Sequence, residues 1–170
     1  MAVLKIVKND YSDSDTLKDL VNYIQNDDKT HGDIGAQGTS LSDPSECMYR
    51  VRNYFCQTEG KSVQHFILSF GEKDKTSLLD AMGLGYAVCA LYPEYQVIFG
   101  VHHNTNHLHI HWAMNPVNTR TGKKFSFTYG ETFGLRKGIA RLLEPYNISC
   151  KLRIDERRID LCSIMQKSIL

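Results

Sequence analysis

The chain has 170 residues, of which 42% are hydrophobic and 23% are charged, enough for one globular domain with a substantial core. No apolar run reaches membrane-spanning length, the N-terminus becomes acidic too early for a signal peptide, and the five cysteines form no C-x-x-C pair. These features argue against a membrane segment, a disulfide framework and a zinc ribbon, and they predict a cytoplasmic protein with reduced thiols. The net charge of +1 hides an acidic first part and a basic last part.

The first part of the chain predicts a strand, a helix, a long loop and a second helix. The apolar residues 3–7 are typical of a strand, and an apolar stripe at helical spacing predicts a helix over residues 16–26. Tyr23 lies at the edge of that stripe, so its ring is expected to reach beyond the core. Residues 26–43 are rich in Asp, Gly, Ser and Thr and lack periodicity, which indicates a mobile or functional loop. A helix is expected over residues 43–60.

The second part predicts strands and helices around one hairpin. In chain order we expect a strand over residues 63–70, a helix over 74–91, hairpin strands over 95–102 and 107–114, a strand over 125–129, a helix over 132–143 and a strand over 148–154. The tail from residue 155 is expected to be a helix or a frayed end. This order of elements predicts an α+β sandwich, with helices packed on a mostly antiparallel sheet of about five strands.

Five of the seven histidines lie between residues 102 and 111, in the predicted hairpin. His107, His109 and His111 alternate with apolar residues, so they share one face of a strand whose other face is buried. His102 lies on the preceding strand. It shares the face of the other histidines in any register in which two paired residue numbers add to an odd number, such as 102 opposite 107 or 102 opposite 109. A row of imidazoles adds nothing to the packing of a sheet, whereas neutral imidazole is a common ligand of transition metals.

The four histidines cannot all bind one ion, because His107 and His111 are roughly 13 Å apart along a strand. Pairing of His102 with His109 makes these two and His111 the compact set. A tighter turn favours His102, His107 and His109 instead. Gly100 lies on the same face and is expected to leave space beside the imidazoles. Three imidazoles without a carboxylate favour Zn²⁺, Mn²⁺, Co²⁺ or Ni²⁺ over Ca²⁺, and the open coordination position favours a catalytic ion.

The basic residues gather after the histidines. Residues 1–115 hold 9 Lys and Arg against 14 Asp and Glu, whereas residues 116–170 hold 11 against 5. The basic part opens with Arg120, Lys123 and Lys124. Such a surface beside a metal site indicates a polyanionic substrate, although a solvated charged face explains the charge alone equally well.

Four segments resemble the motifs of one known family. HHNTNHLHIHWAMN, from His102 to Asn115, closely resembles the three-histidine motif of conjugative relaxases, the mobilisation nucleases of plasmids and integrative elements in the HUH endonuclease superfamily. LKDLVNYI, which contains Tyr23, resembles the family's tyrosine motif, and HFILSF, which begins at His65, resembles its second motif. NTRTGKK follows the histidine motif in many members. The likeness covers roughly residues 3–154.

The resemblance implies a relaxase-like fold and a transesterification. Tyr23 would attack a phosphodiester of single-stranded DNA at an origin of transfer, remain joined to the 5′ phosphate and release a 3′ hydroxyl. A divalent ion (Mn²⁺, Mg²⁺ or Zn²⁺) held by His102, His109 and His111 would polarise the scissile phosphate. His107 is the candidate for the base, or for a contact to DNA.

The resemblance also implies DNA contacts and partners. The candidate DNA-binding residues are Ser69, Asn115, Arg120, Lys123 and Lys124. Accessory relaxosome proteins are expected partners in the bacterial cytoplasm. Residues 1–170 would form a single relaxase domain, either complete or as the N-terminal part of a longer protein. Asn104 stands where relatives commonly have Asp, and an Asn neither takes a proton nor offsets a positive charge.

Other functions use the same residues. A rolling-circle replication initiator of the same superfamily would share the chemistry, although initiators usually carry the tyrosine after the histidines. A catalytically inactive single-stranded DNA-binding module, or a domain with a purely structural metal, would keep the site without cleavage. Detection of strand cleavage with an oligonucleotide separates these classes.

The chain holds nine tyrosines, so Tyr23 has competitors for the role of nucleophile. Tyr86, Tyr95 and Tyr129 occupy patterns that predict burial. The main competitors are Tyr11, Tyr49 and Tyr54, which lie in or near the predicted mobile part of the chain.

Overall fold

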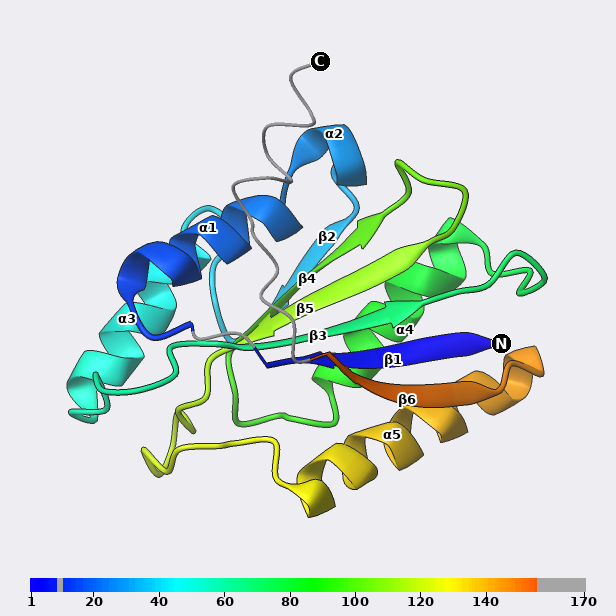
Figure 1. The fold of residues 1–170 in the computed structure, drawn as a ribbon. Coiled ribbons are helices and arrows are strands. Elements are labelled where there is room, and N and C mark those ends of the chain that lie inside the picture. The colour runs from blue at the N-terminus through cyan, green and yellow to red at the C-terminus, as the bar shows by residue number, and fades with distance from the viewer. Residues whose placement is uncertain (9–10, 156–170) are drawn as a thin grey trace.

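The computed structural model describes residues 1–8 and 11–155, and a sheet of six strands forms its centre (Figure 1). In chain order the strands are β1 (Ala2–Val7), β2 (Ile34–Gln37), β3 (Gln64–Ser69), β4 (Val97–His102), β5 (His109–Met114) and β6 (Cys150–Asp155). They lie side by side in the order β2-β4-β5-β3-β1-β6. Neighbouring strands are antiparallel except β1 and β6, which are parallel. The predicted α+β fold with a mostly antiparallel sheet is confirmed.

Helices cover both faces of the sheet. They are α1 (Ser14–Ile24), α2 (Asp27–Thr30), α3 (Pro44–Tyr54), α4 (Leu78–Cys89) and α5 (Tyr129–Leu143), and a 3-10 turn (Glu144–Tyr146) follows α5. α1 packs against β4 and β5 on one face, with α3 beside it (Figure 1). α4 packs against β2, β4 and β5 on the other face, where α5 contacts α4 and β6. Within the described residues, no helix has the length and apolar character needed to cross a membrane.

The alternation of the hairpin strands divides the interior into two cores. Ile110, Trp112 and Met114 pack in the larger core with α4, where the indole N–H of Trp112 donates to the carbonyl of Gly85 at 3.1 Å. The smaller core lies on the histidine side of the sheet. It contains the predicted apolar stripe of α1, formed by Leu17, Leu20, Val21 and Ile24. The buried face predicted from the alternation of the histidine stretch is therefore confirmed.

The structure replaces one predicted loop with two short elements. The sequence predicts a loop over residues 26–43, but α2 and β2 lie there, and β2 pairs with β4 at the edge of the sheet. β2 has only four residues, and one of them is Gly35, where a Cβ would lie 2.3 Å from the Phe99 ring. A strand this short, with few apolar side chains, has too little alternation for its period to be recognised.

The predicted strand over residues 125–129 is wrong. An isolated bridge joins Val117 to Lys124, and Tyr129 already begins α5. Phe125 and Phe127 alternate with polar residues because their rings pack against each other, with centroids 5.0 Å apart, and against the larger core. Their pattern reflects aromatic packing in an irregular segment instead of strand pairing.

Smaller differences concern a helix start, two tyrosines and the tail. α4 begins at Leu78, later than predicted, because Ser77 and Asp80 form a capping box that fixes the first turn there. The predicted burial of Tyr86 and Tyr129 is wrong, since they are 49% and 90% exposed. The sequence predicts the tail from residue 155, but Asp155 ends β6, and the rest of the tail lies outside the described residues.

Candidate active site

The register of the hairpin decides which histidines come together. His102 pairs with His109, and Gly100 pairs with His111. His102, His109 and His111 therefore form a histidine row on one face of the sheet. His107 precedes β5 and lies in the turn of the hairpin. Of the two compact sets that the sequence leaves open, this register gives the first.

The C-terminal end of α1 contacts β4 at Gly100. A Cβ on Gly100 would lie 2.2 Å from the carbonyl oxygen of Ile24, the last residue of α1. The same carbonyl accepts a hydrogen bond from His102 Nε2 at 3.1 Å. The space predicted beside the imidazoles is therefore filled by the end of the helix. This contact fixes the position of Tyr23, the residue before Ile24.

The ring of Tyr23 lies against the histidine row. It makes edge contacts with His102 and His111, with ring centroids 5.2 and 5.4 Å away. Lys29 Nζ lies 4.2 Å from the centroid of the Tyr23 ring. Within the described residues no hydrogen bond joins the Tyr23 hydroxyl to another group, and burial raises the pKa of the phenol. A phenol in such surroundings needs a nearby positive charge or a base to act as a nucleophile.

The surroundings of two competing tyrosines differ from those of Tyr23. Tyr11 is 2% exposed, and its hydroxyl is 2.9 Å from Nδ1 of His65 in the smaller core. Tyr54, at the end of α3, is 80% exposed and packs on the neighbouring ring of Phe55. Neither surrounding resembles the contact of Tyr23 with two imidazoles.

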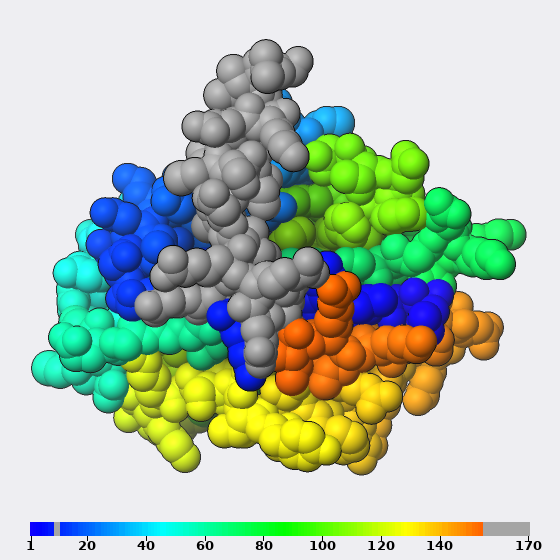
Figure 2. All heavy atoms as spheres, in the orientation of Figure 1, coloured from blue at the N-terminus to red at the C-terminus, as the bar shows by residue number. Residues whose placement is uncertain are grey.

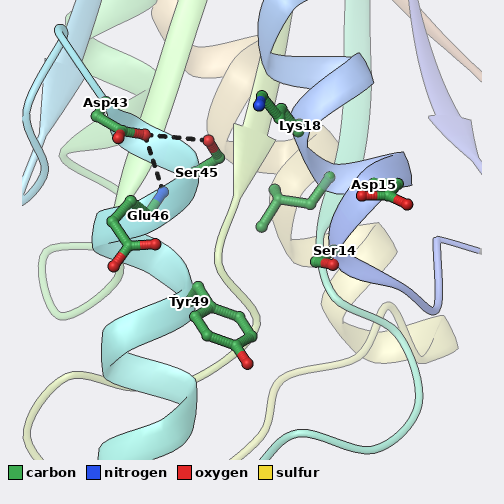
Figure 3. Close-up of a pocket in the computed structure, with 8 residues that line it drawn as sticks. Ser14, Asp15, Lys18, Asp43, Ser45, Glu46 and Tyr49 are labelled. Carbon is green, nitrogen blue, oxygen red and sulfur yellow. Dashed lines mark hydrogen bonds between the residues drawn. The ribbon is translucent and has the colours of Figure 1, made fainter.

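The third competitor, Tyr49, lies in an acidic cleft. The cleft has a volume of about 320 Å³ and is lined by residues of α1, by Asp43 and by residues of α3 (Figure 3). Asp43 and Glu46 from the α3 side and Asp15 from α1 line it with Tyr49. Carboxylates repel a phosphodiester, so this cleft disfavours attack by Tyr49.

The match to a family profile covers most of the chain. The profile of relaxases with a MobA/VirD2-like nuclease domain matches residues 23–148. The chain belongs to this relaxase family. No curated protein and no solved structure gives a significant match. The matched residues include Tyr23 and the whole histidine row.

The histidine row of the relaxase is neutral. Burial lowers the pKa of His102 to about 4, that of His111 well below its ordinary value, and that of His109 in the same direction. Neutral rings offer lone pairs, so the donor chemistry fits a divalent transition metal. In the described part of the chain no three His, Cys, Asp or Glu side chains are gathered to hold an ion. The rings of His102 and His111 are stacked, with centroids 4.4 Å apart, so ligation requires them to turn about their side-chain bonds.

His65 extends the histidine row into the smaller core. Its Nε2 is 3.3 Å from Nδ1 of His111, and its Nδ1 contacts the hydroxyl of Tyr11. Burial lowers the pKa of His65 to about 3, so the ring is neutral and carries one proton. When His65 donates that proton to Tyr11, it accepts from His111, and Nε2 of His111 is left for an ion. Strand alternation alone places His65 on this face, but it gives no sign of the partner Tyr11.

Two residues predicted to bind DNA have different surroundings. Ser69 pairs with His109 across β3 and β5, so it lies at the histidine row. Asn115 is fully buried, and its amide donates to the carbonyl of Met48 and to Oε1 of Gln96. These hydrogen bonds give Asn115 a role in joining α3 to the sheet.

Arg120, Lys123 and Lys124 form a basic turn that follows β5, beyond the end of that strand opposite the histidine row. Arg120 forms an ion pair with Glu94 at 2.8 Å, and Lys124 Nζ donates to the carbonyl of Glu59. Lys123 is exposed beside them. Two of the three cations therefore already have polar partners in the protein. The length of β5 separates all three from Tyr23.

Proposed function

We propose that this relaxase nicks one strand of DNA at an origin of transfer, with a divalent metal and a covalent tyrosyl intermediate, during conjugative mobilisation of a plasmid or integrative element. The reaction takes place in the bacterial cytoplasm. The main support is the ring of Tyr23, which the contact between α1 and β4 holds against His102 and His111. A nucleophile beside neutral imidazoles that can ligate a cation suits phosphodiester transfer.

The proposed reaction exchanges one phosphate ester for another. The Tyr23 oxygen forms a bond to phosphorus while the bond from phosphorus to the 3′ oxygen breaks. The 5′ phosphate stays on the tyrosine, and the 3′ oxygen takes a proton and leaves as a hydroxyl. His102, His109 and His111 would hold the metal, which would supply positive charge beside the phosphate. His107 stays the candidate for the base, because its Nδ1 is buried and has no hydrogen-bond partner among the described residues.

A covalent adduct tests this function directly. The protein is incubated with end-labelled single-stranded oligonucleotides of randomised sequence and analysed on denaturing gels. We expect a labelled band that survives detergent and heat, together with fragments whose 3′ hydroxyl a polymerase can extend. Cleavage without an adduct would identify a hydrolytic nuclease, and binding without cleavage would identify an inactive DNA-binding module.

Loss of one imidazole tests the metal site. Replacing His109 with Ala is expected to weaken binding of Mn²⁺ or Zn²⁺ by more than about 100-fold, since even loss of a partner outside the ligand set costs 10–100-fold. Titration calorimetry measures the affinity, and cleavage is expected to fall with it. His107→Ala is the matched control and should bind metal normally. Unchanged affinity in His109→Ala would assign the ion to another set, with His107 as the first replacement.

A basic strip of Lys5, Lys151 and Arg153 leads across the sheet toward the histidine row. Lys5 is in register with Ile67 and, through it, with His111, while Arg153 pairs with Lys5 across β1 and β6. Paired residues point to the same face, and two strand spacings separate Lys5 from His111 by roughly 10 Å. Figure 2 shows the atoms of β1 and β6 side by side at the surface of the molecule. The strip is a proposed path for the DNA backbone.

The salt dependence of DNA binding distinguishes the basic strip from the basic turn. Neutralising Lys5, Lys151 and Arg153 to Gln is expected to reduce the salt slope by roughly 2, because each phosphate contact on a single strand contributes roughly 0.7. The matched triple variant changes Arg120, Lys123 and Lys124 to Gln. It should reduce the slope less, since Arg120 is already paired with Glu94. Fluorescence anisotropy at several salt concentrations measures both. The opposite ranking would place the backbone at the turn.

A further inference from the structure

Lys29 is a largely buried residue whose ammonium group has no anionic partner among the described residues. The residue is 7% exposed, and its Nζ lies over the ring of Tyr23. No hydrogen bond or ion pair of this ammonium group is formed within the described residues. Burial of an ammonium group costs free energy unless an opposite charge or several acceptors compensate it, and here burial lowers the pKa of Lys29. A largely covered lysine whose ammonium group has no anionic partner among the described residues is a candidate to bind an anion.

The backbone fixes Lys29 beside the histidine row. Asn26 caps α2 by accepting from the Asp28 N–H at 2.9 Å. The carbonyl of Lys29 accepts from the N–H of His103 at 3.0 Å, and His103 Nε2 donates to the carbonyl of Thr30 at 3.0 Å. α2 is thus attached to the residue that directly follows β4.

We propose that Lys29 is a further catalytic residue, whose ammonium group binds a non-bridging oxygen of the scissile phosphodiester and stabilises negative charge on the attacking oxygen of Tyr23. The inference rests on the proposed function. Lys29 keeps its protons throughout, and the bonds that form and break are those between phosphorus and the two ester oxygens. The incoming phosphate supplies the anion that Lys29 lacks among the described residues.

The charge of Lys29 favours attack by Tyr23, and the charge of the phosphate favours the ammonium form of Lys29. Lys29 Nζ lies 4.2 Å from the centroid of the Tyr23 ring, and a cation so close stabilises negative charge that develops on the attacking oxygen. A bound phosphate in turn favours the charged form of Lys29. Both effects require no reorganisation when the charge develops, because the cation already lies beside the ring. The alternative is a lysine whose aliphatic stem only packs on Tyr23.

Two variants separate the charge from the packing. Lys29→Met keeps an unbranched apolar stem and is expected to slow adduct formation by about 10²–10³-fold, the usual loss for one group that stabilises developing charge. Lys29→Arg keeps the charge and should stay within about tenfold of the natural protein. Lys18→Met is the matched control. It removes a lysine from the outer side of α1, in the acidic cleft, and should leave the rate unchanged.

The binding experiment identifies the phosphate that Lys29 contacts. An oligonucleotide that the natural protein cleaves is prepared with a neutral methylphosphonate at the scissile position, and its affinity is measured in the Tyr23→Phe background. The neutral linkage should weaken binding about tenfold more when Lys29 is present than when Met replaces it, because any contact of a metal with the phosphate is lost in both.

The outcomes are distinct. Equal losses of affinity with Lys29 and with Met, or normal adduct formation by Lys29→Met, would overturn the role of Lys29 and leave the nicking function standing. Absence of any adduct with the natural protein would overturn the proposed function and this inference with it. Thermal unfolding controls for the fold, and Lys29→Met is expected to be at least as stable as the natural protein because it removes an unpaired buried charge.

Discussion

Replacement of Tyr23 with Phe is expected to abolish strand cleavage and the covalent adduct while the fold persists. The change removes one oxygen, and no hydrogen bond is lost among the described residues, so the free energy of unfolding should change by less than about 1 kcal/mol. Without the oxygen the phosphate has no acceptor, so the adduct should be undetectable on denaturing gels. DNA affinity should change little, because the proposed phosphate contacts belong to Lys29 and the basic strip.

Phe variants of the other candidate tyrosines serve as controls. Tyr49→Phe alters a residue of the acidic cleft and should leave cleavage unchanged. Tyr11→Phe removes the hydrogen bond to His65 and should lower metal affinity without preventing adduct formation at saturating metal. An adduct that persists in Tyr23→Phe would move the nucleophile to another tyrosine. Cleavage that persists without an adduct would make water the nucleophile.

Replacement of Gly100 with Ala adds only one methyl group, yet it is expected to destabilise the protein strongly. The new Cβ would lie 2.2 Å from the Ile24 carbonyl oxygen, and both atoms are fixed to backbone, α1 on one side and β4 on the other. We expect a loss of about 3 kcal/mol in the free energy of unfolding, at the upper end of the cost of overpacking. Because α1 must move, Tyr23 should leave the histidine row, and cleavage should be lost even where the protein is folded.

Gly83 provides the matched control. It lies inside α4, and a Cβ there meets no atom within 4 Å. Gly83→Ala should therefore stabilise the protein by about 0.5–1 kcal/mol through helix propensity alone. Urea unfolding and adduct formation are measured for both variants. Equal stability of the two would mean that α1 does not depend on its contact with Gly100.

Much of the fold was predictable because it depends on local periodicity. The alternation from His109 to Met114 and the stripe on α1 both require only the period of one element, and both faces are confirmed. The hairpin register is different, since it depends on how many residues the turn uses. Both sets of histidines fit the sequence, and only the pairing of His102 with His109 distinguishes them.

Parts of the site depend on contacts between distant segments, which periodicity does not describe. Lys29 belongs to a stretch of sequence without periodicity. Its proposed role follows only from its contact with the ring of Tyr23, which the sequence does not show. The contact of Tyr11 with His65 joins a residue before α1 to the middle strand β3. The basic turn shows the converse, since Arg120 follows the histidines closely in sequence, yet β5 carries the chain roughly 20 Å away in six residues.

The parallel pairing of β1 with β6 has a consequence for how the molecule assembles. Ala2 pairs with Cys150 and Val7 with Asp155, the contacts of longest sequence separation in the sheet. Closing so long a loop costs conformational entropy before any contact offsets it, so the local β4–β5 hairpin is expected to form early and the β1–β6 pair late. During synthesis the histidine row would then take shape before Lys151 and Arg153 reach Lys5. The surface proposed to hold the DNA backbone is the last part of the sheet to be completed.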